Sequence, residues 1–419
     1  MKSRSPLFVL TILALLFGAT FSPAQEWPRF RGNNGTGIGK LSSLPAQFTE
    51  ADYSWVIKLD GVGHSSPVLW GDKLFLTIVK EDNSKRSVLC IDSNTAETLW
   101  TWEHPFEEHN LNNHNNFASS TPTVDENGVY VVWGSGMETR VFSISHEGKE
   151  MWHREWPKFT SDHGFGSSPI IVDGTLVFHT DSKDERRSYV IGLNPKSGET
   201  IWELERATPE SDPKHLTAYN TPTSVTVGGK EVLVVLQTND GWKGIDPKSG
   251  DVLWSFDGEY KLRSVGAIAT GNDIVFATLG SGSRGQDATA LRLKENGDPE
   301  VLYSLDKKAR LGYVPSPLIY EGKLFLLRDA EDLSCLDLKT GEILHHVEVP
   351  GNFFSSPVIA DGKLLFASKE GDFFAYSADE KLEHLGTSRL PSGMNASPAI
   401  ANNRLFLRTD THLICIEGK

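Results

Sequence analysis

The sequence is short of several residue types that mark particular protein classes. Only three cysteines and four methionines occur in 419 residues, which excludes a small scaffold held together by disulfides. Beyond the N-terminus, no apolar run approaches the roughly 18 residues that a membrane-spanning helix needs. Positive charge is scarce, because 41 Lys and Arg stand against 55 Asp and Glu, a net charge of −14. We expect no membrane span and, since an acidic surface repels phosphates, no nucleic-acid partner.

The usual catalytic signatures are missing as well. The sequence has no Gly-x-Ser-x-Gly elbow, no His-Glu-x-x-His and no phosphate-binding loop. His104, His109 and His114 share an Asn-rich loop, but their five-residue spacing is not a metal-binding pattern. We therefore predict no catalytic residue and no metal site, and interpret these histidines as solvated loop residues.

The N-terminus has the pattern of a secretory signal peptide. Lys2 and Arg4 precede an apolar run over residues 7–19, and Ala24 ends a short stretch of small residues. Residues 1–24 are thus predicted to be removed after Ala24, which makes the protein periplasmic or secreted. We expect an N-terminal extension over residues 25–52, a single folded domain over 53–419 and a monomer.

Export would permit disulfides, so the three cysteines need their own interpretation. Cys90, Cys335 and Cys415 each lie within two residues of an acidic residue, at the same point of a repeated strand. This favours three small buried strand residues. A disulfide between Cys90 and Cys415 is the alternative, because their repeats would be neighbours in a ring.

A repeat of about 50 residues organises the chain. Its first mark is an aromatic residue, at Trp100, Trp152, Trp202, Trp254 and Tyr303. Its second mark is a small residue before proline, at Ser66-Pro67, Thr121-Pro122, Ser168-Pro169, Thr221-Pro222, Ser316-Pro317, Ser356-Pro357 and Ser397-Pro398, with the proline missing near Gly266. Between the marks, alternating apolar residues and tight turns predict four strands. Eight such repeats, beginning near residues 64, 117, 165, 219, 265, 313, 353 and 395, predict an all-β fold, an eight-bladed β-propeller of four-stranded blades.

The last repeat has only three strands, and an N-terminal segment can supply the fourth. Residues 53–59 alternate in character and place Trp55 where the other blades have their aromatic residue. We predict that this strand completes the last blade and closes the ring. The repeated aromatic residues are predicted to pack between blades, at Trp55, Trp100, Trp152, Trp202, Trp254 and Tyr303. Asn194, Asp246 and Asp337 are predicted to cap the tight turns that follow them.

The repeat resembles that of the quinoprotein-like propellers, whose blade signature is Ala-Leu-Asp-x-x-Thr-Gly-x-x-x-Trp. Residues 246–254 and 337–344 carry it, and residues 26–37, 63–67 and 116–122 resemble exported propellers common in planctomycetes. The family includes dehydrogenases that bind pyrroloquinoline quinone with calcium and, more distantly, a non-catalytic outer-membrane assembly factor. Many of the dehydrogenases have adjacent cysteines and a calcium site of Glu, Asn and Asp, and neither is recognisable here. The resemblance covers both classes, and the missing quinone-site features favour a non-catalytic binding scaffold without a cofactor, with a quinoprotein oxidoreductase as the alternative.

Loop lengths indicate which face of the propeller binds. The long loops fall together on one face, and long loops concentrate binding function. The residues predicted to ring the channel mouth on this face are His64, Asn116, His163, Asn220, Arg263, Arg310 and Asn352. They predict an anionic or carbonyl-rich ligand or partner segment, from a protein or an envelope polymer. The alternative is that these side chains only solvate a water-filled channel.

Overall fold

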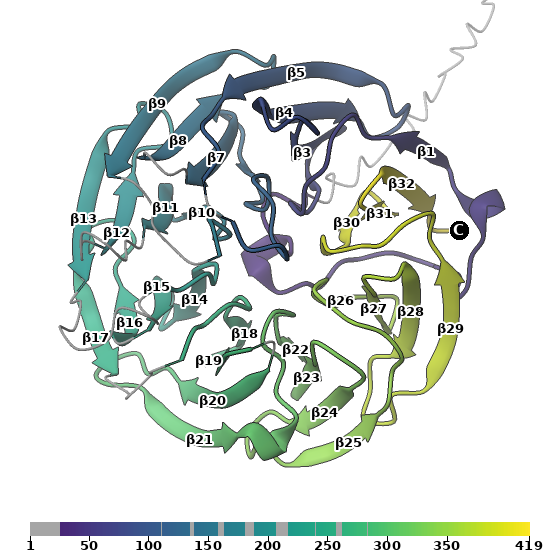
Figure 1. Ribbon diagram of the computed structural model, residues 1–419. Coiled ribbons are helices and arrows are strands. Elements are labelled where there is room, and N and C mark those ends of the chain that lie inside the picture. Colours follow the sequence, from purple (N-terminus) through teal and green to yellow (C-terminus); the bar gives the residue numbers. More distant parts are fainter. Residues whose placement is uncertain are drawn as a thin grey trace, which may run out of the picture.

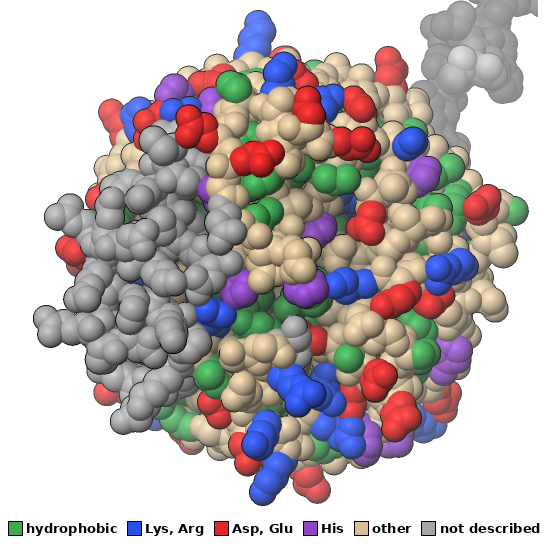
Figure 2. Space-filling model, viewed as in Figure 1, with side chains coloured by type: hydrophobic (Ala, Val, Ile, Leu, Met, Phe, Trp, Pro, Cys, Tyr) green, Lys and Arg blue, Asp and Glu red, His purple; other side chains and the backbone are tan. Residues whose placement is uncertain are grey.

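Eight four-stranded antiparallel sheets form a ring around a central channel (Figure 1). The computed structural model describes residues 26–109, 111–134, 138–157, 163–180, 188–206, 217–238, 240–256, 262–282 and 284–419. The ring confirms the predicted eight-bladed propeller, and the predicted signal peptide lies outside the described residues. Acidic and basic side chains are mixed around its rim (Figure 2). No helix within these ranges is long and apolar enough to cross a membrane.

The first seven blades are simple meanders in which consecutive strands pair. Blade 1 has β2 (Val68–Trp70), β3 (Lys73–Val79), β4 (Lys85–Asp92) and β5 (Thr98–Pro105). Blade 2 has β6 (Thr123–Val124), β7 (Val129–Gly134), β8 (Glu138–Ile144) and β9 (Glu150–Pro157). Blade 3 has β10 (Ile170–Val172), β11 (Thr175–Thr180), β12 (Ser188–Leu193) and β13 (Thr200–Arg206). Blade 4 has β14 (Thr223–Val227), β15 (Lys230–Gln237), β16 (Gly241–Ile245) and β17 (Val252–Phe256).

The second half of the ring repeats this order. Blade 5 has β18 (Ala269–Gly271), β19 (Ile274–Gly280), β20 (Gly285–Arg292) and β21 (Glu300–Asp306). Blade 6 has β22 (Leu318–Tyr320), β23 (Lys323–Leu327), β24 (Leu333–Asp337) and β25 (Ile343–Val347). Blade 7 has β26 (Val358–Ala360), β27 (Lys363–Ala367), β28 (Asp372–Ser377) and β29 (His384–Arg389). Short 3-10 helices are η1 (Asn33–Gly35), η2 (Glu50–Asp52) and η4 (Lys307–Ala309).

Blade 8 joins the two ends of the chain. It contains β30 (Ala399–Ala401), β31 (Arg404–Arg408), β32 (His412–Glu417) and, as its outer strand, β1 (Trp55–Lys58). The register runs from Trp55 opposite Cys415 to Lys58 opposite His412. The predicted closure is therefore confirmed, with a strand shorter than the expected 53–59. The outer edge of β32 is covered by this pairing.

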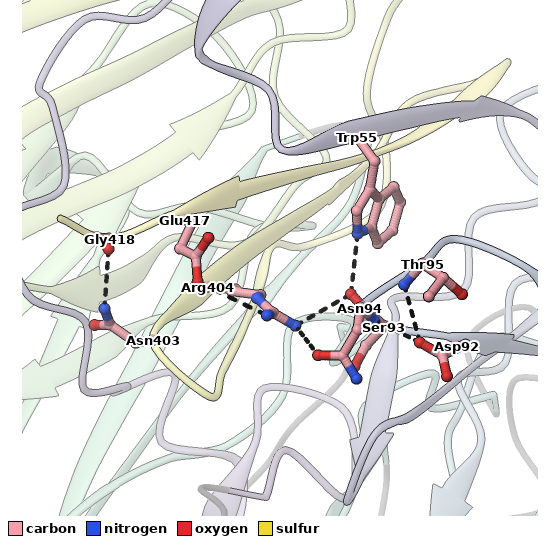
Figure 3. Close-up of polar contacts among 9 residues, drawn as sticks. All are labelled: Trp55, Asp92, Ser93, Asn94, Thr95, Asn403, Arg404, Glu417 and Gly418. Carbon is pink, nitrogen blue, oxygen red and sulfur yellow. Dashed lines mark hydrogen bonds and ion pairs between the residues drawn. The ribbon is translucent and has the colours of Figure 1, made fainter.

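Polar contacts fasten blade 8 to blade 1 (Figure 3). The Trp55 indole N–H donates to the Ser93 carbonyl at 2.9 Å. Arg404 donates to the Asn94 side-chain oxygen at 2.6 Å and lies 3.7 Å from the Glu417 carboxylate. The junction where the ring closes thus uses the same aromatic position as blades 1 to 5.

The outer aromatic residues contact the turn of the next blade. Their polar hydrogens donate to carbonyls there, from Trp100 to His146, Trp152 to Pro195, Trp202 to Pro247 and Tyr303 to Leu338. The turn glycines facing these rings, Gly148, Gly198, Gly250 and Gly341, have positive φ, and an added Cβ would lie 2.6 to 2.8 Å from the ring. A side chain at these positions would therefore be both strained and in collision. Trp254 packs in an apolar cluster with Ile268 and Leu293 of blade 5.

The turns themselves are capped by acidic or amide side chains. The Asp246 carboxylate accepts from the backbone N–H groups of Lys248 and Ser249. Asn194 and Asp337 do the same in blades 3 and 6. These bonds confirm the predicted capping role, because a short polar side chain replaces the missing backbone partner in a tight turn.

All three cysteines are buried and free. Cys90 lies opposite Trp100, Cys335 opposite His345 and Cys415 opposite Trp55, so each occupies the same position of its blade. Burial raises the pKa of all three thiols, to about 12 for Cys90 and Cys415 and to about 11 for Cys335.

The N-terminal extension crosses the channel, which the sequence did not reveal. We call residues 26–39 the plug; Figure 1 shows this segment, in purple, at the centre of the ring. Trp27 exchanges backbone hydrogen bonds with Leu69 of blade 1, and Pro28 accepts from Val124 of blade 2. Arg29 donates to the Pro222 carbonyl of blade 4, and Arg31 to Pro317 and Pro357 of blades 6 and 7. The plug therefore ties together blades that are not neighbours.

Candidate functional site

A cavity of about 370 Å³ occupies the channel above the plug. Phe30 of the plug lines it at one end, and residues of the loops that lead into the inner strands line it at the other. Histidine side chains gather near the centre of the face seen in Figure 2. The cavity is therefore a cup with a closed floor, open toward the long-loop face.

A ring of small residues forms the lower wall of the cup. We call it the hydroxyl ring; it holds the residue two positions before each blade's inner strand, and all eight line the cavity, Ser66, Thr121, Ser168, Thr221, Ala267, Ser316, Ser356 and Ser397. The backbone N–H of each blade donates to the hydroxyl oxygen of the next, as from Ser66 to Thr121 and from Ser397 back to Ser66. The same bond recurs from Thr121, Ser168, Ala267, Ser316 and Ser356 to the following blade. Ala267 interrupts the ring because it has no hydroxyl to accept from Thr221.

A second ring lies above the first. We call it the upper ring; it holds the residue two positions before each member of the hydroxyl ring, His64, Ser119, Gly166, Tyr219, Val265, Val314, Phe354 and Asn395. In extended backbone, residues two apart point to the same side, so the segment that enters each blade contributes one residue to each ring. The two rings give the cup a polar floor region and a mixed polar and aromatic mouth.

Three of the seven residues predicted at the channel mouth line the cup, namely His64, His163 and Arg263. A guanidinium nitrogen of Arg263 lies 2.8 Å from Nε2 of His163. The His163 ring packs edge-on against Tyr219, with ring centroids 5.6 Å apart. On the opposite side, the Lys369 ammonium lies 4.0 Å from the centre of the Phe354 ring. A cation thus lies beside aromatic rings on two opposite sides of the mouth.

His64 is held neutral. Burial, followed by the charges of Arg408 and Lys369, lowers the pKa of His64 to about 3. Arg408 is fully buried beside it and donates to the Ser65 carbonyl and hydroxyl, both at 2.7 Å. An imidazole with so low a pKa offers one donor and one acceptor near pH 7 but carries no charge.

The other four predicted residues lie outside the cup, which corrects the sequence prediction. Asn220 is buried and donates to the Leu236 carbonyl at 2.7 Å. Arg310 pairs with the buried Asp332 carboxylate, and Asn352 donates to Glu370 at 2.8 Å. Asn116 lines a small separate pocket beside Arg86. Each side chain has a partner in its own blade: Asn116 accepts from the Ala118 backbone N–H, Asn220 bonds to strand β15, and Arg310 and Asn352 pair with carboxylates of nearby loops.

Sequence reasoning missed most of the cup. Phe30, Asn112, His114, Tyr313 and Phe354 line it and were not predicted. The signal for the upper ring was present, because counting two residues back from each small residue before proline finds seven of its eight members; Val265 is missed because blade 5 lacks the proline. Phe30 had no such signal, since the plug carries no repeat.

The lining has a distinctive chemistry. Among the described residues that line the cup there is no carboxylate and no cysteine. The described parts of the chain also hold no group of three His, Cys, Asp or Glu that could bind a metal ion. A calcium ion requires oxygen ligands that usually include carboxylates, so these residues do not fit a calcium-supported quinone.

Comparison with known proteins identifies a family. The chain matches the family described as outer membrane protein assembly factor BamB over residues 54–239 and 243–419. It is 26% identical to BamB of Salmonella typhimurium over 212 residues, 50% of this chain and 49% of that protein. It is 22% identical to BamB of Yersinia pestis over 427 residues, 90% of this chain and 100% of that protein. The match thus spans about half the length of the Salmonella relative and all of the Yersinia one.

Solved structures share the fold at low identity. A europium-containing methanol dehydrogenase superposes with a TM-score of 0.69 at 10% identity, over 91% of this chain and 89% of that one. The quinohemoprotein alcohol dehydrogenase from Comamonas testosteroni gives 0.64 at 13% identity, over 94% and 81%. BamB from Moraxella catarrhalis gives 0.62 at 13% identity, over 87% and 98%. The fold is therefore common to dehydrogenases and an assembly factor, and does not by itself indicate which activity is present.

Proposed function

Because this chain belongs to the family of outer membrane protein assembly factor BamB, we propose that it is a non-catalytic scaffold that holds a protein partner at the cup. The observation that carries this proposal is a cup with a closed floor and no carboxylate among its described lining residues. General acid–base catalysis needs a group whose pKa lies near the working pH. His64, with a pKa of about 3, is a poor base near neutral pH.

The same lining supports a protein without quinone. The fold is shared with quinone-type dehydrogenases, but the cup offers neither cysteines nor carboxylates among its described lining residues. Titration with pyrroloquinoline quinone in the presence of calcium should leave the absorbance spectrum of the quinone unchanged. Stoichiometric binding together with dye-linked alcohol oxidation would establish the quinoprotein alternative instead.

The proposed place of action is the cell envelope. The N-terminal pattern of a signal peptide and the match to an outer membrane assembly factor both support export. A fusion of residues 1–40 to a reporter that is active only outside the cytoplasm should be active. Activity of the reporter only when a known signal peptide replaces residues 1–24 would contradict export.

Site-specific photo-crosslinking tests the binding face. A photoreactive amino acid at Asn112 or Phe354, both at the mouth of the cup, should capture a protein in intact cells. The matched control is the same amino acid at Leu253, which is half exposed on the outer strand of blade 4, and it should capture none. Capture from Leu253 alone would move the interface to the rim and remove the cup from the proposal.

A further inference from the structure

We propose that the cup is a carboxylate site, which receives a peptide C-terminus or a small organic acid with its carboxylate directed at the hydroxyl ring. This rests on the proposed binding role of the cup and adds the chemistry of the group that enters it. Three independent features of the structure support it: unused hydroxyl donors, buried guanidinium groups below them, and a closed floor.

The hydroxyl ring has Ser and Thr hydroxyl protons that no described residue accepts. Its seven Ser and Thr oxygens accept backbone N–H groups, so each hydroxyl keeps its own proton to donate. Only Ser356 donates its proton within the described chain, to Ser316. All seven side chains are at least nine-tenths buried and line the cup. A group rich in acceptor oxygens, such as a carboxylate, can therefore receive several of these protons at once.

Buried positive charge lies around the base of the cup. Arg29 and Arg31 of the plug and Arg408 of blade 8 are each no more than 5% exposed. These guanidinium groups donate to neutral oxygens, on Pro222, Pro317, Pro357 and Ser65. Asp410 interacts electrostatically with Arg408, and the Nε atom of each of the three arginines has no hydrogen-bond partner among the described residues. Burial lowers the pKa of Arg29 to about 10, and of Arg31 and Arg408 to about 9, so all three keep their charge at neutral pH.

Burying a charge such as that of Arg29 or Arg31 is costly, and it raises the electrostatic potential inside the channel; Asp410 offsets part of the charge of Arg408. In a protein of net charge −14, this local positive potential is opposite in sign to the overall charge. An anion that enters the cup would be attracted by this positive potential. Because the cup is partly desolvated, salt screens the attraction less there than at the surface. The three arginines act at a distance, because Phe30 is the plug residue that lines the cavity and none of the arginines lines it.

The shape of the cup restricts what can enter. The plug closes one end, so a chain cannot pass through and only an end or a small molecule fits. About 370 Å³ is near the lower limit of the roughly 300–1,000 Å³ found for small-ligand sites. Tyr219 and Phe354 of the upper ring offer apolar surface for the body that carries the carboxylate, and Arg263 adds a cation at the mouth.

Calorimetric titration of the protein lacking residues 1–24 tests the proposal with defined probes. One pair is acetyl-Ala-Phe with a free carboxylate and the same peptide as its amide; the other is 3-phenylpropionate and 3-phenylpropionamide. At least one acid should bind, its amide should bind at least tenfold more weakly, and the Kd of the acid should rise with salt. Binding by the peptide alone indicates a chain end as the natural ligand, and binding by the small acid alone indicates a free metabolite.

Variants distinguish binding inside the cup from a general effect of positive charge on the same face. Arg263→Gln and Thr121→Val, which removes a ring hydroxyl at nearly constant volume, should each weaken binding of the acid at least fivefold. Ser397→Ala is the second ring variant in case Thr121→Val fails to fold. Arg310→Gln, on the same face but paired with Asp332 outside the cup, should leave the Kd unchanged.

Equal binding of acid and amide would overturn the proposal, as would unchanged binding in Arg263→Gln and the ring variants, or equal weakening by Arg310→Gln. Failure of every probe to bind would overturn it too. Crosslinking from Asn112 could still succeed in that case, so the scaffold role and the carboxylate site can fail separately.

Discussion

At the scale of single residues, the buried histidine of blade 3 makes the stability of the ring depend on pH. His179 is 2% exposed, and its Nε2 lies 2.8 Å from the Asn220 carbonyl. Burial, followed by the charge of Arg206, lowers the pKa of His179 to about 4. The unfolded chain takes up this proton at an ordinary pKa near 6.5, while the folded protein does not. The buried histidine therefore does not lower the free energy of unfolding above pH 6.5. This free energy falls as the pH drops from 6.5 toward 4.

We predict that denaturant unfolding at pH 7.5 and pH 5 will show this loss, of which His179 accounts for about 2 kcal/mol at pH 5. His179→Gln retains an amide N–H for the Asn220 carbonyl but has no proton to gain in this range. Its stability should depend less steeply on pH than that of the unmodified protein. An identical pH dependence in the two proteins would show that His179 titrates normally in the fold.

At the scale of elements, an aromatic side chain of the outer strand packs on the turn of the next blade and donates a hydrogen bond to a carbonyl there. Tyr303 of β21 donates to the Leu338 carbonyl of blade 6 at 3.1 Å, where blades 1, 2, 3 and 8 use an indole N–H. We predict that Tyr303→Phe, which removes only the hydroxyl, lowers the free energy of unfolding by about 1 kcal/mol, since a half-buried carbonyl loses its partner.

The control is Tyr189→Phe, because the Tyr189 hydroxyl forms no hydrogen bond with a described residue. It should change the unfolding free energy by less than about 0.5 kcal/mol. Equal effects of the two substitutions, measured by denaturant unfolding, would show that the inter-blade bond contributes nothing specific.

At the scale of the whole molecule, the N-terminal region closes the structure twice. β1 completes blade 8, and the plug with its following segment buries Trp27, Leu41, Leu44 and Phe48 against the ring. Each of these side chains contributes about 1.5–3 kcal/mol when fully buried. We predict two steps of destabilisation by calorimetry. A chain beginning at Thr49 loses the plug and melts lower than one beginning at Gln25, and a chain beginning at Gly61 also loses β1 and melts lower still.

The second step tests closure specifically, because the chain beginning at Gly61 leaves β32 with an unpaired edge. Such an edge should also make this chain prone to association, which light scattering can follow. If all three chains melted at one temperature, neither the plug nor β1 would support the ring.

The sequence by itself determined the repeating part of this protein. Turn residues such as Asp246 and Gly250, the indole of Trp254 and the small residue before proline act over a few positions, so their order along the chain already defines a blade. Counting these marks gave eight blades, and the missing last strand indicated β1. Local motifs that recur along the chain can be recognised from the sequence alone.

Only the tertiary structure decided what surrounds the channel. Arg31 donates a hydrogen bond to the carbonyl of Pro317, 286 positions along the chain, and no repeat pattern predicts such a contact. Arg310 and Asn352 looked like mouth residues but pair within blade 6 and blade 7, because a side chain takes the partner that its loop brings near. His64 and Arg263 belong to blades far apart in sequence and share one cup only because the ring closes. Convergence of this kind depends on the path of the whole backbone, which residue type and spacing do not encode.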